Sequence, residues 1–219
     1  MKLAKSFYAR SALTVAPKLL GKLLVRNVGG VRISGRIVEV EAYMGSEDPA
    51  SHGFRGKTER NAVMFGPAGR TYVYFTYGNH FCVNVVTGRE GKASAVLLRA
   101  LEPREGLPFM CRRRKKRRVT DLASGPGKLS QALAIDRKLN GADLGGKALW
   151  IEMDPKRERI SRTRSGRVGI SAATELQYRF YIAGSPFVSK GRPGPAARKR
   201  SRQIRPKSSS KRTMSSSPK

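Results

Sequence analysis

Short runs of alternating apolar and polar residues dominate the chain and predict a protein built mainly of β-strands. A period of two residues is typical of a strand with one buried face, because successive side chains point to opposite sides. Gly and Asn separate several of these runs, as expected for tight turns. The segments predicted as strands are 23–26, 31–33, 36–43, 93–100, 168–170 and 179–182, with two more strands in 71–86 on either side of a turn at Gly78 and Asn79.

Two segments carry helical signals. Residues 11–20 form a short helical pattern that ends at Gly21, and a second helix opens at Gly-Pro-Gly-Lys (125–128), with Pro near its first turn, and continues through Ala134. Long crossover helices between strands are missing, which disfavours a doubly wound sheet. We therefore expect one α+β domain on a curved, largely antiparallel β-sheet, with a protruding β-hairpin and peripheral helices.

The charge balance indicates a polyanionic partner. The 219 residues hold 45 Lys and Arg against 15 Asp and Glu, a formal net charge of +30. Self-repulsion of this size is rarely kept unless a polyanion is the usual companion, and nucleic acid is the leading candidate. The first 17 residues carry three cations and no unbroken apolar run. We therefore expect neither secretion nor a membrane partner.

Two segments concentrate the positive charge. Residues 190–219 hold 11 cations and no acid in a Gly-, Pro- and Ser-rich sequence, which predicts a disordered basic tail after a folded domain at 1–189. Residues 112–118 are seven consecutive cations. They could not all face one side of a packed helix, so they predict an exposed loop.

Cysteine and histidine are scarce. Cys82 and Cys111 are too few for a disulfide framework or a four-thiolate zinc site, and only His52 and His80 could supplement them. We expect a reducing compartment, no structural metal and no cofactor.

Residues 37–43 place two carboxylates and an aromatic ring on one face of a strand. The alternation sets Glu39, Glu41 and Tyr43 opposite Val38 and the apolar residues that follow it. A solvated acidic face is the usual interpretation of such a pattern. However, the protein is short of acids, and Asp48, His52 and several glycines follow closely, as in a site loop. The carboxylates could therefore act as a general base toward water or as metal ligands.

A dense aromatic run at residues 72–77 leads into the Gly78 turn. Core packing and cross-strand pairing account for Phe75 and Phe81. Tyr77 is different, because it abuts the turn and should project at the hairpin tip, where a large ring is exposed without obtaining burial. On a basic protein this suggests a wedge between base pairs, with Tyr43, Tyr74 and His52 as faces for stacking on a base.

These motifs together resemble the alkyladenine (3-methyladenine) DNA glycosylase family. The match extends from about Leu19 to Ser189, with the motifs in the family's order. The motifs are Gly-Arg-Ile-Val-Glu-Val-Glu-Ala-Tyr (35–43), Glu-Asp (47–48), His52, Tyr-Val-Tyr (72–74), Tyr-Gly (77–78), Cys-Val-Asn (82–84), Leu-Leu-Arg-Ala-Leu-Glu-Pro (97–103), Ser-Gly-Pro-Gly-Lys-Leu (124–129), Phe-Tyr (180–181) and Gly-Ser-Pro (184–186).

The resemblance implies a monofunctional hydrolase of base excision repair. It would cut the N-glycosidic bond of alkylated or deaminated purines, of the 3-methyladenine, ethenoadenine and hypoxanthine class, after flipping the base out of double-stranded DNA. It implies Glu41 as the catalytic base and Arg99 as a second holder of the water. The other implied roles are base binding by Tyr43, His52, Tyr74 and Asn84, intercalation by Tyr77, and phosphate or water positioning by Lys128 and Val168.

Two other classes stay open from the residues alone. One is a non-catalytic DNA-binding protein, which the carboxylate of Glu41 opposes because it would weaken binding to phosphates. The other is a metal-dependent nuclease that uses Glu39, Glu41 and Asp48. We expect a monomer, cytoplasmic and nucleoid-associated in a bacterium or nuclear in a eukaryote.

Overall fold

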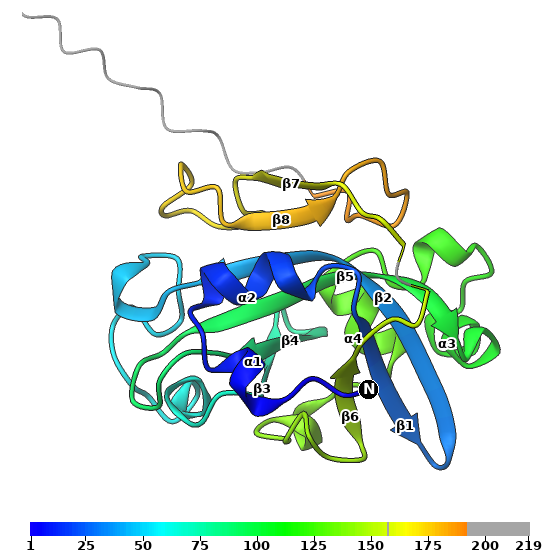
Figure 1. Cartoon of the computed structure of the whole chain (residues 1–219), viewed down its shortest axis with the longest axis horizontal. Coiled ribbons are helices and arrows are strands. Elements are labelled where there is room, and N and C mark those ends of the chain that lie inside the picture. Colours follow the sequence, from blue (N-terminus) through cyan, green and yellow to red (C-terminus); the bar gives the residue numbers. More distant parts are fainter. Residues whose placement is uncertain (157, 192–219) are drawn as a thin grey trace, which may run out of the picture.

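One long strand organises the sheet. The computed structural model describes residues 1–156 and 158–191, and every strand pair in this part of the chain is antiparallel (Figure 1). The strands are β1 (Leu23–Val28), β2 (Val31–Tyr43), β3 (Thr71–Thr76), β4 (His80–Val86), β5 (Ala95–Glu105), β6 (Leu149–Glu152), β7 (Arg162–Ser165) and β8 (Arg179–Ile182). Four α-helices and four 3-10 turns accompany them. They are α1 (Lys5–Tyr8), α2 (Ala12–Leu19), α3 (Leu107–Arg114), α4 (Pro126–Ala132), and the turns Gly45–Glu47, Ala62–Phe65, Val119–Asp121 and Arg137–Leu139.

Strand β2 pairs along both of its edges. The main path of the sheet is β3-β4-β5-β2-β1-β6, and β8 joins β2 while β7 joins β8. Strand β1 accompanies the first half of β2 as far as Arg36, so the edge beyond it is open for β8, which pairs with Glu39, Val40 and Glu41. Register shifts at Gly35 and around Glu39 interrupt the pairing with β5, and such bulges bend a sheet. The expected α+β fold on a curved antiparallel sheet is confirmed.

Apolar faces of two helices complete the core around β2. Helix α2 lies across β2 and β5 (Figure 1) and buries Val15 and Leu19. Its N-terminus is capped by Ser11, whose hydroxyl accepts a hydrogen bond from the Thr14 amide. Helix α4 packs on β4 and β5 through Leu129. None of the helices in the described part of the chain is long and apolar enough to cross a membrane.

Two predicted segments differ from the structure because a short local pattern does not show how far a strand or helix continues. The runs 31–33 and 36–43 are one strand, since Ser34 and Gly35 continue the pairing with β5. The basic block is a loop only from Lys115 onward. Its first three arginines form the last turn of α3, which a buried Met110 anchors and where the helix dipole favours cations.

Two further predictions are wrong at turns. Residues 168–170 form no strand, because Gly169 adopts a φ of 75° and the late strand is β7. The β3–β4 hairpin does not turn on Gly78 and Asn79 alone. Its strands end at Thr76 and resume at His80, and the positive φ values fall on Tyr77 and Gly78. The predicted basic tail lies outside the described residues except for Lys190 and Gly191.

The turn that leads from β2 into the next loop depends on a glycine with no space around it. Gly45 has a φ of 64°, and a Cβ there would lie 1.9 Å from the carbonyl oxygen of Ala93, whereas Gly29 has a φ of 56° and no atom within 4 Å. We predict that Gly29→Ala costs roughly 1 kcal/mol of unfolding free energy, from its left-handed backbone alone. Gly45→Ala should cost about 1–3 kcal/mol more, from overpacking. Urea denaturation of both variants measures the difference, and equal losses would contradict it.

Candidate active site

The two glutamates of β2 are buried. Glu39 and Glu41 lie in the middle of the sheet and have no exposed surface, although both are acidic. The interpretation as a solvated acidic face is therefore wrong. A carboxylate removed from water must be compensated by hydrogen bonds or opposite charge. Its partners consequently define the site.

Three donors hold the carboxylate of Glu41. Oε1 accepts from the backbone amide of Val168 at 2.7 Å, and Oε2 accepts from the Tyr43 hydroxyl at 2.9 Å and from Arg99 Nη1 at 3.3 Å. Each carboxylate oxygen can accept about two hydrogen bonds. Oε2 is therefore filled by the protein, whereas Oε1 keeps one acceptor position for another molecule.

Glu39 orients the same arginine from behind. It accepts from Arg99 Nε at 2.9 Å and from Arg179 Nε at 2.7 Å. Ser189 adds its amide at 2.6 Å and its hydroxyl at 2.9 Å. Burial lowers the pKa of Arg99, but Glu41 and Glu39 raise it more, so the net shift is upward and the guanidinium stays charged. No sequence pattern singled out Arg179 or Ser189 as partners of Glu39, because long-range partners leave no local pattern.

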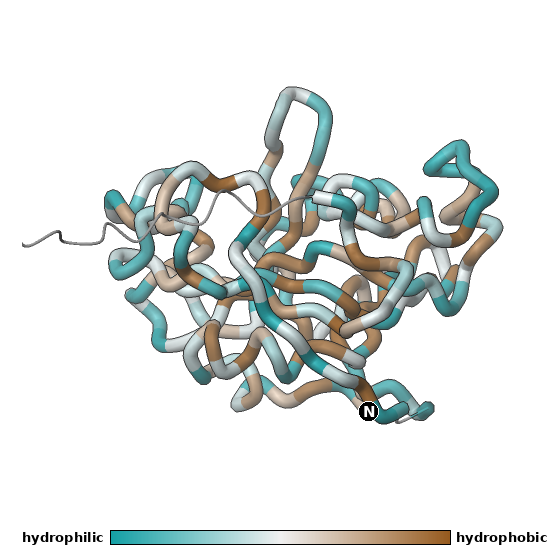
Figure 2. Tube along the Cα trace, turned by 90° about the horizontal axis from the view of Figure 1, so that it is seen from above, coloured by the Kyte–Doolittle hydropathy of each residue, from teal (hydrophilic) through white to brown (hydrophobic). Residues whose placement is uncertain are grey.

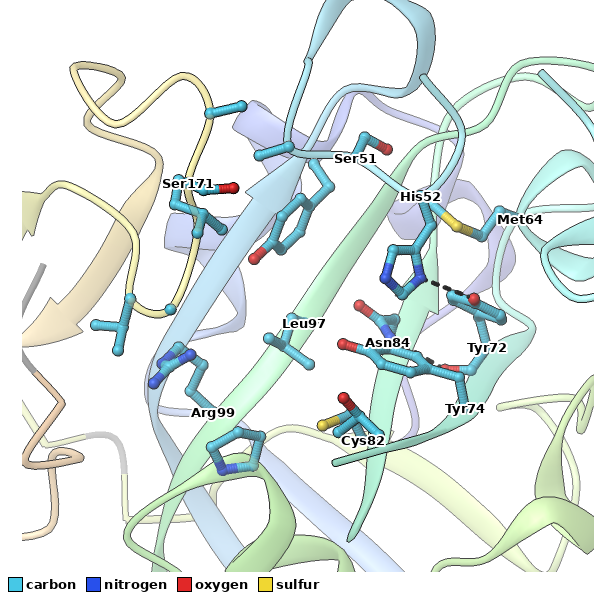
Figure 3. A pocket seen from close by; sticks show the side chains of 18 of the residues that line it. Ser51, His52, Met64, Tyr72, Tyr74, Cys82, Asn84, Leu97, Arg99 and Ser171 are labelled. Atoms are coloured by element: carbon cyan, nitrogen blue, oxygen red, sulfur yellow. Dashed lines mark hydrogen bonds between the residues drawn. The ribbon is translucent and has the colours of Figure 1, made fainter. Parts of the chain in front are cut away.

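A cavity of about 400 Å³ opens in front of these groups. In Figure 3, His52, Tyr72, Tyr74 and Asn84 gather on one side, while Arg99 and Ser171 lie on the other. Most of the predicted site residues line it: Tyr43, His52, Tyr74, Tyr77, Asn84, Arg99 and Val168. Glu41 itself lies directly behind three of these lining residues. Lys128 is not part of the lining, although Pro126 at the start of α4 is.

The rings on the aromatic side of the cavity contact one another and are uncharged at neutral pH. The rings of Tyr72 and Tyr74 stack at 5.3 Å between centroids, and His52 meets Tyr74 edge-on at 4.6 Å. His52 Nδ1 also hydrogen bonds to the Tyr72 hydroxyl at 2.9 Å. Burial raises the pKa of Tyr72 to about 12 and places that of Tyr74 higher still. Partial burial and then the charge of Arg60 lower the pKa of His52, which keeps the imidazole neutral.

Tyr72 is a site residue whose role the sequence did not reveal. Its hydroxyl holds His52, and its carbonyl accepts a hydrogen bond from the Asn84 side chain at 3.1 Å. The alternation of β3 already places Tyr72 on the same face as Tyr74. That shared face was a usable signal, but core packing explains it equally well without the register of β4.

The β3–β4 hairpin presents Tyr77 to solvent in a strained conformation. Its side chain is 81% exposed, and its φ is 51°. A bulky residue in the left-handed region costs roughly 1–2 kcal/mol, and such strain is typical of functional positions. The hairpin stands clear of the body as the tallest loop in Figure 2. Tyr77 nevertheless belongs to the cavity lining, so the tip overhangs the opening.

The arrangement defines a class of enzyme. A flat, neutral aromatic cavity suits a nucleobase, a buried carboxylate with a free acceptor position suits the activation of a water, and the positive surface suits DNA. The family model described as "Methylpurine-DNA glycosylase (MPG)" matches residues 6–186. The chain belongs to this family.

Relatives of similar length agree with the family assignment. A protein of Carboxydothermus hydrogenoformans is 51% identical over 87% of this chain and all of its own. One from Chlorobaculum tepidum is 46% identical over 93% of this chain and 98% of its own, and one from Methanoculleus marisnigri is 51% identical over 87% and 100%. Each is named "Putative 3-methyladenine DNA glycosylase". The protein is a DNA glycosylase for alkylated purines, an enzyme of DNA repair.

The contacts of Glu39 predict that this residue matters for folding. Glu39→Gln would leave Arg99 and Arg179 without the negative charge that they share. Breaking a buried ion pair in this way costs about 3–5 kcal/mol of stability. Glu105→Gln removes a half-exposed partner of Arg32 and should cost about 1 kcal/mol or less. Guanidinium denaturation of both variants measures the contrast, and similar losses would show that Glu39 is not the structural centre of the network.

Proposed function

We propose that the enzyme flips a damaged purine into the cavity and hydrolyses its N-glycosidic bond with a water that Glu41 activates. Its substrates are alkylated and deaminated purines of the 3-methyladenine, ethenoadenine and hypoxanthine class. The observation that carries the proposal is the Glu41 carboxylate, which three donors fix behind the cavity with one acceptor position open on Oε1.

The chemical step follows from that position. As the bond between C1′ and the purine nitrogen breaks, its electron pair leaves with the base and the sugar acquires oxocarbenium character. The water oxygen bonds to C1′ while Oε1 of Glu41 takes the water's proton. Because Arg99 and the Tyr43 hydroxyl both donate to Oε2, they hold the carboxylate plane in one orientation. Fixing the water against C1′ is what such a site contributes most.

The neutral aromatic side accounts for the preference for damaged purines. An alkylated purine carries positive charge and leaves readily, and aromatic faces attract cations. A protonated His52 would repel such a base, and the lowered pKa of His52 prevents this near neutral pH. Tyr43, His52 and Tyr74 supply the faces for stacking. Asn84 lies where it can screen the exocyclic group of the purine.

Val168 serves the water site through its backbone. Its amide already donates to Glu41, so it positions the carboxylate that takes the proton from the water. Lys128 makes no hydrogen bond or ion pair with another described residue. It stands two residues after Pro126 of the cavity lining, and we assign it to a DNA phosphate.

We assign to the protein base excision without strand cleavage, carried out by a monomer on double-stranded DNA. Its compartment is the cytoplasm, at the nucleoid, in a bacterium or the nucleus in a eukaryote. The basic residues of 190–219 add affinity for phosphates that does not depend on sequence. The nuclease alternative finds no support. The described residues contain no group of three His, Cys, Asp or Glu side chains that could hold a metal, because arginines occupy Glu39 and Asp48.

A panel of duplexes tests the proposed function directly. Each duplex carries one ethenoadenine, hypoxanthine or alkylated purine, and release of the free base is measured under single-turnover conditions in a chelator. The proposal expects base release with an intact strand that contains an abasic site. Direct strand cleavage, or activity that the chelator abolishes, would contradict it. Borohydride trapping of a covalent complex would contradict the monofunctional mechanism.

In the same assay we predict that Glu41→Gln loses about 10² to 10⁴ in excision rate, because the amide cannot take the proton from water. Affinity for lesion-containing duplex should stay near that of the wild type, since the shape of the side chain is kept. Glu47→Gln, an exposed carboxylate on the turn after β2, is the matched control and should excise normally. Excision by Glu41→Gln within tenfold of the wild type would remove Glu41 from the role.

For the hairpin we predict that Tyr77→Ala weakens lesion capture. Nothing then fills the gap left by the flipped nucleotide, and unstacking a base step costs a few kcal/mol that the ring offsets. The loss should shrink when the lesion lies opposite a mismatch, where restacking is weaker. Affinity titrations of wild type and variant in both contexts measure this. An equal loss in both would show that Tyr77 only supports the hairpin.

A further inference from the structure

The cavity is bounded by two loops that no strand pairing joins. Residues 49–52 form one rim and include His52, while residues 168–172 form the other and include Val168. The residue immediately before each loop is a buried charge. These are Asp48 and Arg167, and they form an ion pair with each other.

The pair is enclosed and has the geometry of a fork. Arg167 Nη1 donates to Asp48 Oδ2 at 2.5 Å, and Nη2 donates to Oδ1 at 2.7 Å. Neither residue has exposed surface. Nη1 also donates to the carbonyl oxygen of Ala42 at 3.0 Å, which anchors the guanidinium to β2 between Glu41 and Tyr43. Two hydrogen bonds to one carboxylate and a third to a carbonyl oxygen fix its orientation as a lysine could not.

The same guanidinium packs against two aromatic rings, one of which lines the cavity. Its central carbon lies 4.7 Å from the ring centre of Tyr43 and 5.3 Å from that of Tyr178. It therefore limits how far the Tyr43 ring can retreat from the cavity. The next residue along the chain is Val168, whose amide donates to Glu41. One side chain thus determines the position of a stacking ring and of a donor to the catalytic carboxylate.

We propose that the Asp48–Arg167 pair is a positioning device that holds the two cavity loops at a fixed separation and aims Glu41 through Val168. This proposal rests on the proposed function of Glu41. Arg167 touches neither the base nor the water; it acts through Tyr43 and Val168. Neither Asp48 nor Arg167 contributes a side chain to the cavity lining. Their role is therefore separable from contact with the substrate.

Three variants separate positioning from stability. Arg167→Lys keeps the charge but loses the fork. Arg167→Met leaves Asp48 buried and unpaired, so it should melt at a lower temperature. Asp48→Asn combined with Arg167→Met removes both charges and should recover melting temperature, because Asn can still accept from the Ala50 amide as Asp48 does now. Arg36→Lys is the control. It alters a largely buried pair with Glu102 that lies outside the cavity.

Single-turnover excision at saturating enzyme, measured well below each melting temperature, is the readout. We expect Arg167→Lys and the double variant to be about 10- to 100-fold slower than the wild type, since small misplacements of catalytic groups have effects of that size. Their affinity for lesion-containing duplex should fall less than the rate, because the pair lies outside the cavity lining and touches neither the base nor the water. Arg36→Lys should keep the wild-type rate and affinity.

Recovery of the rate together with the melting temperature in the double variant would overturn the proposal and leave the pair a purely structural one. An Arg167→Lys variant that keeps the wild-type excision rate would do the same. A failure of the proposed function gives a different result, because the wild type itself would then release no base, or Glu41→Gln would excise normally.

Discussion

The burial of two carboxylates in alternate positions of one strand is the constraint on which the rest of this structure depends. Glu39 and Glu41 lie at the centre of the sheet with no exposed surface. An unpaired charge there would be strongly destabilising. Arg99 from β5, Arg179 from β8 and the segment at Ser189 all converge on them. Strands β5 and β8 are therefore attached to β2 by charge as well as by backbone pairing.

That convergence distinguishes the two glutamates. Glu39 accepts hydrogen bonds from Arg99, Arg179 and Ser189 and is the anchor of the network. The donors to Glu41 all belong to residues that line the cavity. The role proposed for Glu41 depends on this difference, because a carboxylate held only by cavity residues lies next to whatever occupies the cavity.

The side of the cavity opposite Arg99 is built from uncharged rings. Tyr72, Tyr74 and His52 hold one another through ring contacts and a single hydrogen bond, and burial keeps all three neutral. A surface of this kind offers uncharged faces for stacking to a flat ring. At the hairpin tip, the left-handed backbone of the exposed Tyr77 is tolerated because the strands behind it are well paired.

The sequence by itself determined the elements with a strong local cause. Alternation identified most strands and the shared face of Glu39, Glu41 and Tyr43, and a turn signal located the hairpin. The order of the motifs indicated the family, and most of the site residues that it predicted line the cavity. These features depend on neighbours two to four residues away or on short motifs, both of which are visible in a linear chain.

Only the tertiary structure decided which carboxylate is an anchor and which is available for chemistry. Partners more than a hundred residues distant make that distinction, as Arg179 does for Glu39 and Val168 for Glu41. The same holds for the pairing of Arg167 with Asp48, which lie 119 residues apart and which no local pattern links. Burial of a charge is a property of the packed chain, because it depends on what the other strands and loops place around it.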